Sequence, residues 1–419
     1  MPRSEAYDGD SIAVVRLLEV APREIFPPRR GITVRLAALG GQLSQRHEVR
    51  QLTLADGRPR RRRGMDAVTF SPSYTELRRV HPLGALAVGV SNRFWHGAPL
   101  LAGVALRASG PGTLAPLFHW PDVVSVVYPW QFGVCRRLAP PGIPCVYSSA
   151  NVESDKFRSW GEAIGVSRAA AEPWLRYVKR AELSAVAQAD LVTAVSEDDR
   201  QTFVEHFGAD PDRTVVVPNG VDCIRFKPAS PEERTNARRE LGLPDRPVVL
   251  FQGADMPANR AGLEWVRRLA AEDVRFTYLV VGSVATPERS EALVAVGSVQ
   301  DMRPYLAAAD LGICPIAHGG GTKLKLLECM AAGLPAVVFS EAIRGTAARP
   351  DEHVLLAGKT TGELTAALAT LAGNPDLARS LGTAARDLVV RRYDWAAIAS
   401  GLEQALSGLC AGEHSGATG

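Results

Sequence analysis

The chain has 419 residues, of which 46% are hydrophobic and 22% are charged, and its net charge is +3. These values exclude a largely disordered chain and a protein whose overall charge alone would draw it to nucleic acid. The length predicts more than one domain. Residues 1–200 carry a net charge of +7 and residues 201–419 carry −4. The basic first half indicates either an acidic ligand, an anionic membrane surface or a solvated basic face.

The start of the sequence is polar and acidic, and it predicts no signal peptide. The most apolar stretch, residues 81–107, is interrupted by Ser91, Asn92, Arg93 and His96, so we do not expect it to cross a membrane. The six cysteines are scattered and lack the spacing of a metal site. We therefore expect a cytoplasmic protein without a bound metal. Peripheral contact with the inner face of the membrane remains open.

Short β-rich runs alternate with helical patterns along the whole chain, which is typical of parallel sheets covered by helices. In the first half, strands are predicted at Ile12–Leu17, Val49–Leu54, Ala67–Phe70, Val123–Val127, Cys145–Ser148, Leu191–Val195 and Thr214–Val217. In the second half, they are predicted at Val248–Gln252, Thr277–Val281, Leu293–Val296, Leu311–Cys314, Ala336–Phe339 and Val354–Leu356. Helices are predicted between them, for example at Arg176–Ala189, Leu263–Ala270 and Pro375–Tyr393. Each set of strands is sufficient for one doubly wound parallel sheet.

A segment rich in proline and charge, with an Asn-Gly pair, separates the two halves. We predict an N-terminal domain over residues 1–220 and a linker over 221–246. A C-terminal domain follows over 247–395, and a last segment covers 396–419.

Several common catalytic and nucleotide-binding motifs are missing. No G-x-G-x-x-G follows the first strand, which argues against a nicotinamide-dependent dehydrogenase. No G-x-x-x-x-G-K-[ST] motif of a P-loop kinase occurs, and neither G-x-S-x-G nor H-E-x-x-H is found.

The most informative stretch is GGGTKLKLLE, Gly319–Glu328. Glycines let backbone N–H groups approach an anion, and the start of a helix adds partial positive charge. Lys323 and Lys325 stand at the unfavourable end of the helix dipole unless an anion lies there. Glu328 falls in an apolar helix and needs a partner, for which sugar hydroxyls are suitable. The stretch therefore predicts a cradle for a nucleoside diphosphate. The alternative is a tight turn with an ordinary surface pair between Lys325 and Glu328.

A second motif indicates a family. VVVPNGVDCIRFKP, Val215–Pro228, resembles the interdomain segment of retaining family 4 glycosyltransferases, and it begins the expected distance before the glycine cradle. The segments AVSEDD, RRYDW, SSANVES and PPRRGITVRLAALGGQLSQRHEV resemble further parts of the family pattern. The resemblance covers nearly all of the chain and is strongest in the second half.

The resemblance implies the GT-B fold, an α/β architecture of two Rossmann-like domains facing a cleft, with the C-terminal helix returning to the first domain. It implies an enzyme that needs neither metal nor cofactor. Such an enzyme moves a sugar from a GDP- or UDP-sugar to a small molecule, a glycan or a lipid, with retention of configuration. A role in natural-product biosynthesis falls within this range. The oligomeric state is left open.

The resemblance also assigns roles to individual residues. Lys325 and Glu328 are the predicted catalytic residues, and Asn151 and Glu153 are predicted on the acceptor side, where a helix cap is the alternative. The predicted donor contacts are Gly31, Arg260, His318, Gly319, Gly320, Gly321, Thr322, Lys323, Lys325 and Glu328.

Three positions depart from the family pattern. Gly320 replaces the first of two glutamates, as it does in a subgroup with GGGT loops, while Ala254 replaces an arginine and Ala150 a histidine. These departures keep open the alternative of a non-catalytic protein that binds nucleotide sugars. A GT-B phosphorylase is a separate alternative within the same fold.

Overall fold

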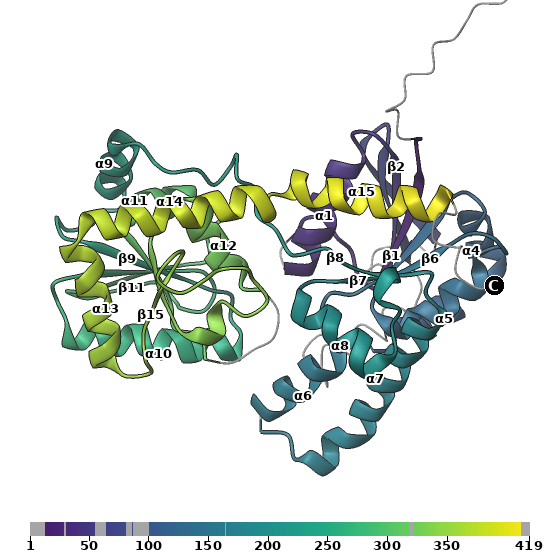
Figure 1. Cartoon of the computed structure of the whole chain (residues 1–419), viewed down its shortest axis with the longest axis horizontal. Helices are drawn as coiled ribbons and strands as arrows, with labels where there is room; N and C mark the ends of the chain where they lie inside the picture. Colours follow the sequence, from purple (N-terminus) through teal and green to yellow (C-terminus); the bar gives the residue numbers. More distant parts are fainter. Residues whose placement is uncertain are drawn as a thin grey trace, which may run out of the picture.

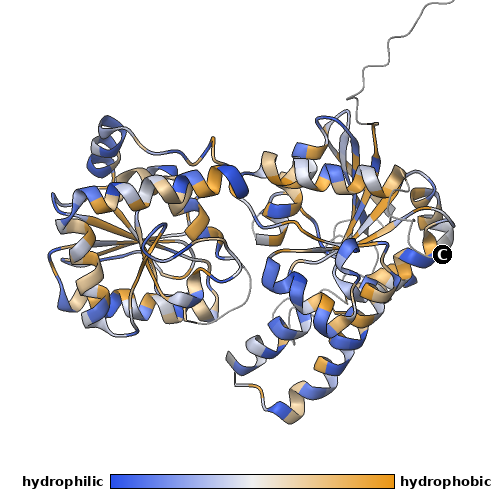
Figure 2. Ribbon diagram, in the orientation of Figure 1, coloured by the Kyte–Doolittle hydropathy of each residue, from blue (hydrophilic) through white to orange (hydrophobic). Residues whose placement is uncertain are grey.

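The computed structural model describes residues 13–28, 31–54, 64–80, 86, 100–163, 165–317 and 322–411. The described chain forms two α/β units, each built around one twisted sheet (Figure 1). The strand order is β3-β4-β2-β1-β5-β6-β7-β8 in the first sheet and β11-β12-β10-β9-β13-β14-β15 in the second. Figure 2 shows apolar strands inside both units and hydrophilic residues on the outer faces of the helices.

The first sheet is parallel except for β3, which pairs antiparallel with β4 at the edge. Its strands are β1 (Arg16–Ala21), β2 (Glu48–Leu54), β3 (Gly64–Ser71), β4 (Tyr74–Val80), β5 (Val123–Val127), β6 (Cys145–Ser148), β7 (Leu191–Ala194) and β8 (Thr214–Val216). All five residues of β5 are buried, as expected for a central strand covered on both faces.

The helices of the first unit cover both faces of this sheet. They are α1 (Gly31–Leu43), α3 (Ala102–Ala108), α4 (Pro111–Phe118), α5 (Pro129–Leu138), α6 (Glu153–Ala163), α7 (Arg168–Gln188) and α8 (Glu197–Phe207). Helix α8 begins where the hydroxyl of Ser196 accepts a hydrogen bond from the Asp199 amide, a typical N-cap. Helices α6 and α7 form a hairpin that extends away from the sheet (Figure 1).

The second sheet is also parallel, apart from β11 at one edge. Its strands are β9 (Val248–Gln252), β10 (Thr277–Val281), β11 (Glu288–Arg289), β12 (Leu293–Gly297), β13 (Leu311–Cys314), β14 (Ala336–Val338) and β15 (Leu355–Leu356). The helices that follow or precede them are α9 (Pro231–Glu240), α10 (Pro257–Glu272), α11 (Arg303–Ala308), α12 (Leu324–Ala331), α13 (Thr361–Gly373), α14 (Pro375–Arg392) and α15 (Trp395–Ala411). Among the described residues, no helix is both long and apolar enough to span a bilayer.

Most predicted strands match observed ones to within a few residues, but the first prediction is wrong. The strand runs over Arg16–Ala21 rather than Ile12–Leu17, and Val14 is 64% exposed. The apolar run at the start of the predicted range leads into the strand but does not belong to it. Strand β4 was missed because its sequence, YTELRRV, is mostly polar. Its place is fixed by the ladder with β2, so tertiary pairing overrides local composition here.

The span expected as a linker contains a helix. Helix α9 begins with a capping box between Ser230 and Glu233, and it packs on α11. Arg234 and Arg238 both form ion pairs with Asp310, which precedes β13. Residues 231–240 are therefore attached to the second unit.

The chain crosses between the two units twice, and the two crossings touch. Val221 and Asp394 form an isolated parallel bridge, and the Val221 amide donates to the Tyr393 carbonyl at 2.8 Å. The Asp394 carboxylate accepts a hydrogen bond from the Cys223 amide at 3.1 Å. After the second crossing, α15 packs on α1 of the first unit (Figure 1).

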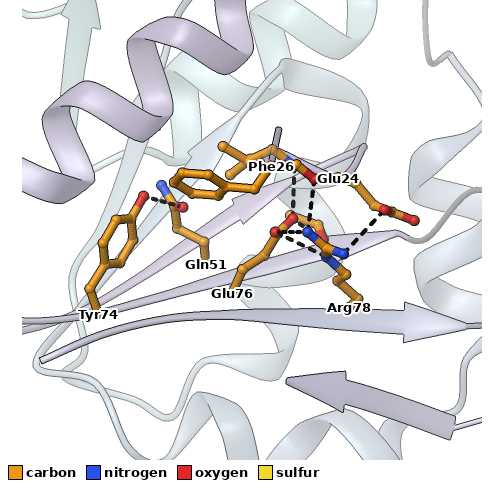
Figure 3. Close-up of polar contacts among 8 residues, drawn as sticks. Glu24, Phe26, Gln51, Tyr74, Glu76 and Arg78 are labelled. Carbon is orange, nitrogen blue, oxygen red and sulfur yellow. Dashed lines mark hydrogen bonds and ion pairs between the residues drawn. The ribbon is translucent and has the colours of Figure 1, made fainter. Parts of the chain in front are cut away.

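Buried Glu76 fixes the loop between β1 and α1 (Figure 3). Its carboxylate accepts hydrogen bonds from the Ile25 amide at 2.7 Å and the Thr53 hydroxyl at 3.1 Å. Arg78 forms an ion pair with Glu76 at 2.7 Å and also donates to the Phe26 carbonyl at 2.8 Å. The loop that leads to the start of α1 is thus held against β2 and β4.

We predict that Gly220→Ala destabilises the protein. A Cβ atom at Gly220 would lie 2.6 Å from Ile398 Cδ1 and 2.7 Å from the Tyr393 carbonyl oxygen, so the two crossings would have to separate. We expect a loss of about 1–3 kcal/mol in urea unfolding. The matched control is Gly401→Ala in α15, where a Cβ meets nothing within 4 Å. It should stabilise by about 0.5–1 kcal/mol. Equal unfolding midpoints for the two variants would contradict the prediction.

Candidate functional site

The predicted cradle lies at the start of α12, on the side of the second unit that faces the first (Figure 1). Lys323 is the N-cap residue and its side chain makes no capping bond, while the first turn contains no acidic residue. Lys325 follows within the first turn. Two ammonium groups therefore stand at the positive end of the helix dipole, where an anion is the complementary ligand.

Lys325 is held in place by residues from the end of β9 and the start of α10. Its Nζ hydrogen bonds to Asn259 Oδ1 and lies 5.2 Å from the centroid of the Phe251 ring. The Gln252 side chain donates to the Lys325 carbonyl at 3.2 Å. Gly253 is needed here, because a Cβ at that position would lie 3.0 Å from the Asn259 side chain. Burial lowers the pKa of Lys325.

Lys323 stands in a similarly crowded position. Burial lowers its pKa, and the nearby charges of Lys325 and Arg344 lower it further. Three cationic groups thus converge at one helix start. An anion bound between them would relieve both their mutual repulsion and their desolvation.

Glu328 lies one turn further along α12. Burial raises its pKa to about 7, although a hydrogen bond from Gln252 and the charges of Arg225 and Lys325 oppose the rise. A carboxyl group with a pKa near 7 is partly protonated at neutral pH, so it can accept hydrogen bonds from hydroxyl groups or donate one to them. The sequence predicted that a carboxyl group in this apolar helix must find a partner or stay neutral, and its role toward a sugar stays a prediction.

The two units meet directly at the cradle. A Cβ atom at Gly31, the first residue of α1, would lie 3.4 Å from Leu324 Cδ1. Gly345 has φ of 74°, and a Cβ there would lie 3.5 Å from the Thr322 hydroxyl and 3.6 Å from Ser196 Cβ. The Thr322 hydroxyl donates to the Gly345 carbonyl at 3.2 Å. The starts of α1, α8 and α12 therefore approach one another, and Gly31 and Thr322 both lie in this region. Their contact with a donor stays a prediction.

Arg260 lies apart from the lysines. Its guanidinium forms a bidentate ion pair with Asp255, at 2.5 Å and 2.8 Å, and its side chain is 65% exposed. The neighbouring Asn259 contacts Lys325 instead. His318, Gly319, Gly320 and Gly321 lie outside the described residues.

Asn151 and Glu153 lie together after β6 in the first unit. Asn151 donates to Glu153 Oε1 at 3.2 Å, and Lys156 Nζ lies 3.4 Å from both Glu153 oxygens. Glu182 of α7 accepts hydrogen bonds from the Glu153 and Ser154 amides, so it caps α6. The amides at the start of α6 thus donate to Glu182, while the Asn151 side chain donates to Glu153, and the acceptor-side role of Asn151 and Glu153 stays a prediction.

Tyr128 adds an aromatic group to the same edge of the sheet. It follows β5 with φ of 74°, an unusual value for a residue other than glycine, and such strain is concentrated at functional sites. Its ring stacks on Trp130 at 4.9 Å, and Lys156 Nζ lies 5.7 Å from its centroid. Trp130 is 8% exposed, and its indole N–H is buried without a hydrogen-bond partner.

Sequence reasoning missed Gln252, Asn259, Arg344, Tyr128 and Lys156. Gln252 and Tyr128 come at or just after the ends of buried parallel strands, and polar groups at such ends are a usable signal. Asn259 and Arg344 offered no such signal, because only the packing of α10 and of the loop after η2 (Ser340–Ala342) brings them to α12. Among the described residues, no three His, Cys, Asp or Glu side chains are placed to hold a metal ion.

Two family descriptions match the chain: Glycosyltransferase Family 4 over residues 29–225, and Glycosyl transferases group 1 over residues 246–374. An α-maltose-1-phosphate synthase from Mycolicibacterium smegmatis is 30% identical over 302 residues, which cover 64% of this chain and 75% of that protein. The chain belongs to glycosyltransferase family 4. A D-inositol 3-phosphate glycosyltransferase from Geodermatophilus obscurus is 33% identical over 61% of this chain and 60% of its own length. The chain thus spans about 60% of that curated relative.

Solved structures of other proteins share the fold over nearly the whole chain. Sucrose-phosphate synthase from Thermosynechococcus elongatus has a TM-score of 0.72 at 20% identity and covers 95% of this chain and 99% of its own. Anabaena HepE in complex with UDP-glucose has a TM-score of 0.63 at 17% identity and covers 94% of this chain and 100% of its own. The predicted GT-B architecture of two Rossmann-like domains is therefore confirmed.

We predict that Glu328→Gln stabilises the protein more at pH 8 than at pH 5. The raised pKa means that the folded state resists ionisation of Glu328, so the wild-type protein bears a cost that grows as pH rises from about 4 towards 7. The gain at pH 8 should reach up to about 3 kcal/mol in urea unfolding. In the control Glu341→Gln, the direction is reversed, because Lys359 lowers the pKa of Glu341. A gain that is the same at both pH values would contradict the assigned cause.

Proposed function

We propose that this protein is a retaining glycosyltransferase that binds a nucleoside-diphosphate sugar at the start of α12 and transfers the sugar to an acceptor held by the first domain. One observation carries the proposal. Burial lowers the pKa of both Lys323 and Lys325, Arg344 adds positive charge near Lys323, and the first turn of the helix contains no acidic residue. Such a concentration of positive charge needs an anionic ligand, and a diphosphate fits it.

In the proposed reaction, the cationic groups at α12 stabilise the charge that develops on the leaving diphosphate. This is electrostatic stabilisation of the transition state, and it supports a mechanism that needs no metal ion. Lys325 is oriented for this role by Asn259 and Phe251. Glu328 lies one turn away and accepts hydrogen bonds from the ribose hydroxyls. Retention of configuration is proposed from membership in the family.

We propose UDP as the first nucleotide to test. The structural neighbour HepE has been crystallised with UDP-glucose, which supports this choice, and GDP remains the alternative. The acceptor is proposed to lie at the ends of β5 and β6, where Tyr128, Asn151, Glu153 and Lys156 gather. Carboxylate and amide groups suit hydroxyls, and the Lys156 ammonium suits a phosphate. The named activities of the relatives from Geodermatophilus and Mycolicibacterium support a phosphorylated sugar or polyol.

We predict that UDP raises the thermal unfolding temperature, and that Lys325→Met and Lys323→Met each weaken its binding about tenfold or more. Each variant loses a charge-assisted contact with the diphosphate. The measurement is a thermal-shift panel with UDP, GDP, ADP and dTDP, followed by calorimetric titration. Lys359→Met is the matched control, because Lys359 pairs with Glu341 elsewhere in the same domain. Arg260→Ala tests the predicted donor contact at Arg260.

A panel in which no nucleotide shifts the wild-type protein would overturn the proposed donor site. Nucleotide binding without transfer to any tested acceptor would instead favour the non-catalytic alternative. Release of sugar phosphate on addition of inorganic phosphate would favour the phosphorylase.

We predict that Lys156→Met raises the KM for a phosphorylated acceptor about tenfold and leaves UDP affinity unchanged. The reason is that Lys156 lies in the first domain, at the proposed acceptor edge. Release of UDP from UDP-glucose is measured with a panel of sugar and polyol phosphates and their unphosphorylated counterparts. Lys179→Met, on the exposed face of α7, is the control. If Lys156→Met raises the KM equally for phosphorylated and unphosphorylated acceptors, Lys156 does not bind an acceptor phosphate.

A further inference from the structure

Arg35 carries a buried guanidinium that joins α1 to the first interdomain crossing, residues 217–221. It is 2% exposed and lies four residues after the start of α1. Its Nη2 donates to the Val217 carbonyl at 2.7 Å, and its Nη1 donates to the Pro218 carbonyl at 2.5 Å, with Asn219 Oδ1 at 3.4 Å. One side chain thus hydrogen bonds to three consecutive residues of the crossing.

The charge of Arg35 acts on one buried carboxyl group of the first domain, whose pKa burial raises to about 7. Glu19 of β1 is 7% exposed, and Arg35 is the charged group that acts on its carboxyl. Gln51 donates to Glu19 Oε2 at 2.6 Å and to the Leu36 carbonyl of α1 at 3.0 Å. Tyr74 in turn donates to Gln51 Oε1 at 2.7 Å (Figure 3). The guanidinium thus acts on the Glu19 end of a buried hydrogen-bond network that runs from Tyr74 of β4 through Gln51 of β2 to Glu19 of β1 and to the backbone of α1.

The same helix is pressed against this network and against α15. A Cβ at Gly40 of α1 would lie 2.6 Å from the Tyr74 hydroxyl and 3.0 Å from Gln51 Nε2, so glycine permits the close approach. A cavity of about 20 Å³, enough for one water molecule, borders Glu19, Arg35 and Val217 as well as Leu402 and Leu406 of α15. Thr193 also lines it, and the buried Thr193 hydroxyl has no hydrogen-bond partner.

Helix α1 also reaches the donor side. Its first residue, Gly31, approaches Leu324 at the start of α12, while Arg35 holds the crossing one turn later. Displacement of the crossing relative to α1 would therefore change the separation between the starts of α1 and α12.

We propose that Arg35 is a positioning residue that couples the donor side of α1 to the interdomain crossing. Nucleotide binding at α12 then stabilises the backbone hydrogen bonds of residues 217–221. The coupling rests on the proposed function, because it assigns the nucleotide to α12. The attachment of Arg35 to residues 217–219, called the clamp, does not rest on the proposed function, because its hydrogen bonds exist without a ligand.

Hydrogen exchange of the full chain, read by mass spectrometry with and without UDP, tests the proposal. Arg35→Lys keeps the charge beside Glu19 but cannot reach two carbonyls in the same way. The double variant Arg35→Met, Glu19→Gln removes both buried charges together and so avoids leaving one unpaired. Arg46→Met is the matched control, because Arg46 follows α1 and pairs with Glu403 of α15 without touching the crossing. The reporting amides are those of Val217 and Val221, which bond to Ala194 and Tyr393.

In the wild type and the Arg46 variant, UDP should slow exchange both in α12 and at residues 217–221. In both Arg35 variants, UDP should slow exchange in α12 alone, and residues 217–221 should exchange about tenfold faster without ligand. UDP affinity should change by less than about threefold. If residues 217–221 of the Arg35 variants exchange at the wild-type rate without ligand, Arg35 does not hold the crossing. If UDP still slows exchange at these residues in the variants, Arg35 does not couple them to the donor side. Absence of UDP protection in wild-type α12 would count against the donor assignment, while the comparison without ligand would still decide the clamp.

Discussion

The buried positive charge at the start of α12 is the constraint on which the rest of the site depends. Burial lowers the pKa of both Lys323 and Lys325, and Arg344 adds a third cationic group. The protein bears this electrostatic cost in the absence of any acidic residue in the first helical turn. Asn259 and Phe251 hold Lys325 in position rather than neutralise it. An anion bound here would offset this cost, and this is why the proposed donor site is centred on α12.

The architecture brings the second half of the site to this charge. In both sheets the polar groups follow the carboxyl ends of parallel strands, where loops are free to carry function. The starts of α1 and α8 from the first domain approach α12 and Gly345 of the second. Tyr128, Asn151 and Glu153 occupy the ends of the neighbouring strands β5 and β6. Donor and acceptor groups can therefore be supplied by separate domains across one interface.

A site that is shared between two domains requires that the domains keep a defined relative orientation. The crossings at Val221 and Asp394 pair with each other, and Gly220 leaves room for α15. Buried Arg35 and the pair of His47 and Glu403, at 3.1 Å, connect the first domain to the crossing and to α15. These contacts bury polar groups that are satisfied only in this arrangement, so they favour one geometry over others.

Much of this protein was predictable from the sequence alone. The alternation of apolar strands and amphipathic helices determined two doubly wound sheets, because burial on both faces leaves a continuous apolar run such as Val123–Val127. Lys325 was selected as a candidate because a lysine is unfavourable at the start of a helix without an anion, and Glu328 because a carboxyl group in an apolar helix needs a partner. The start of β1 and the polar strand β4 were not identified, since pairing with neighbouring strands fixes them.

Tertiary structure alone decided which side chains surround these residues. Asn259 contacts Lys325 while Arg260, its neighbour in sequence, turns to Asp255, and no local pattern distinguishes the two. Arg35 reads as an ordinary helix residue, yet it binds carbonyls more than 180 positions away. Local sequence determines what an element buries, because periodicity follows backbone geometry. It does not determine which distant groups meet, because that depends on how whole elements pack.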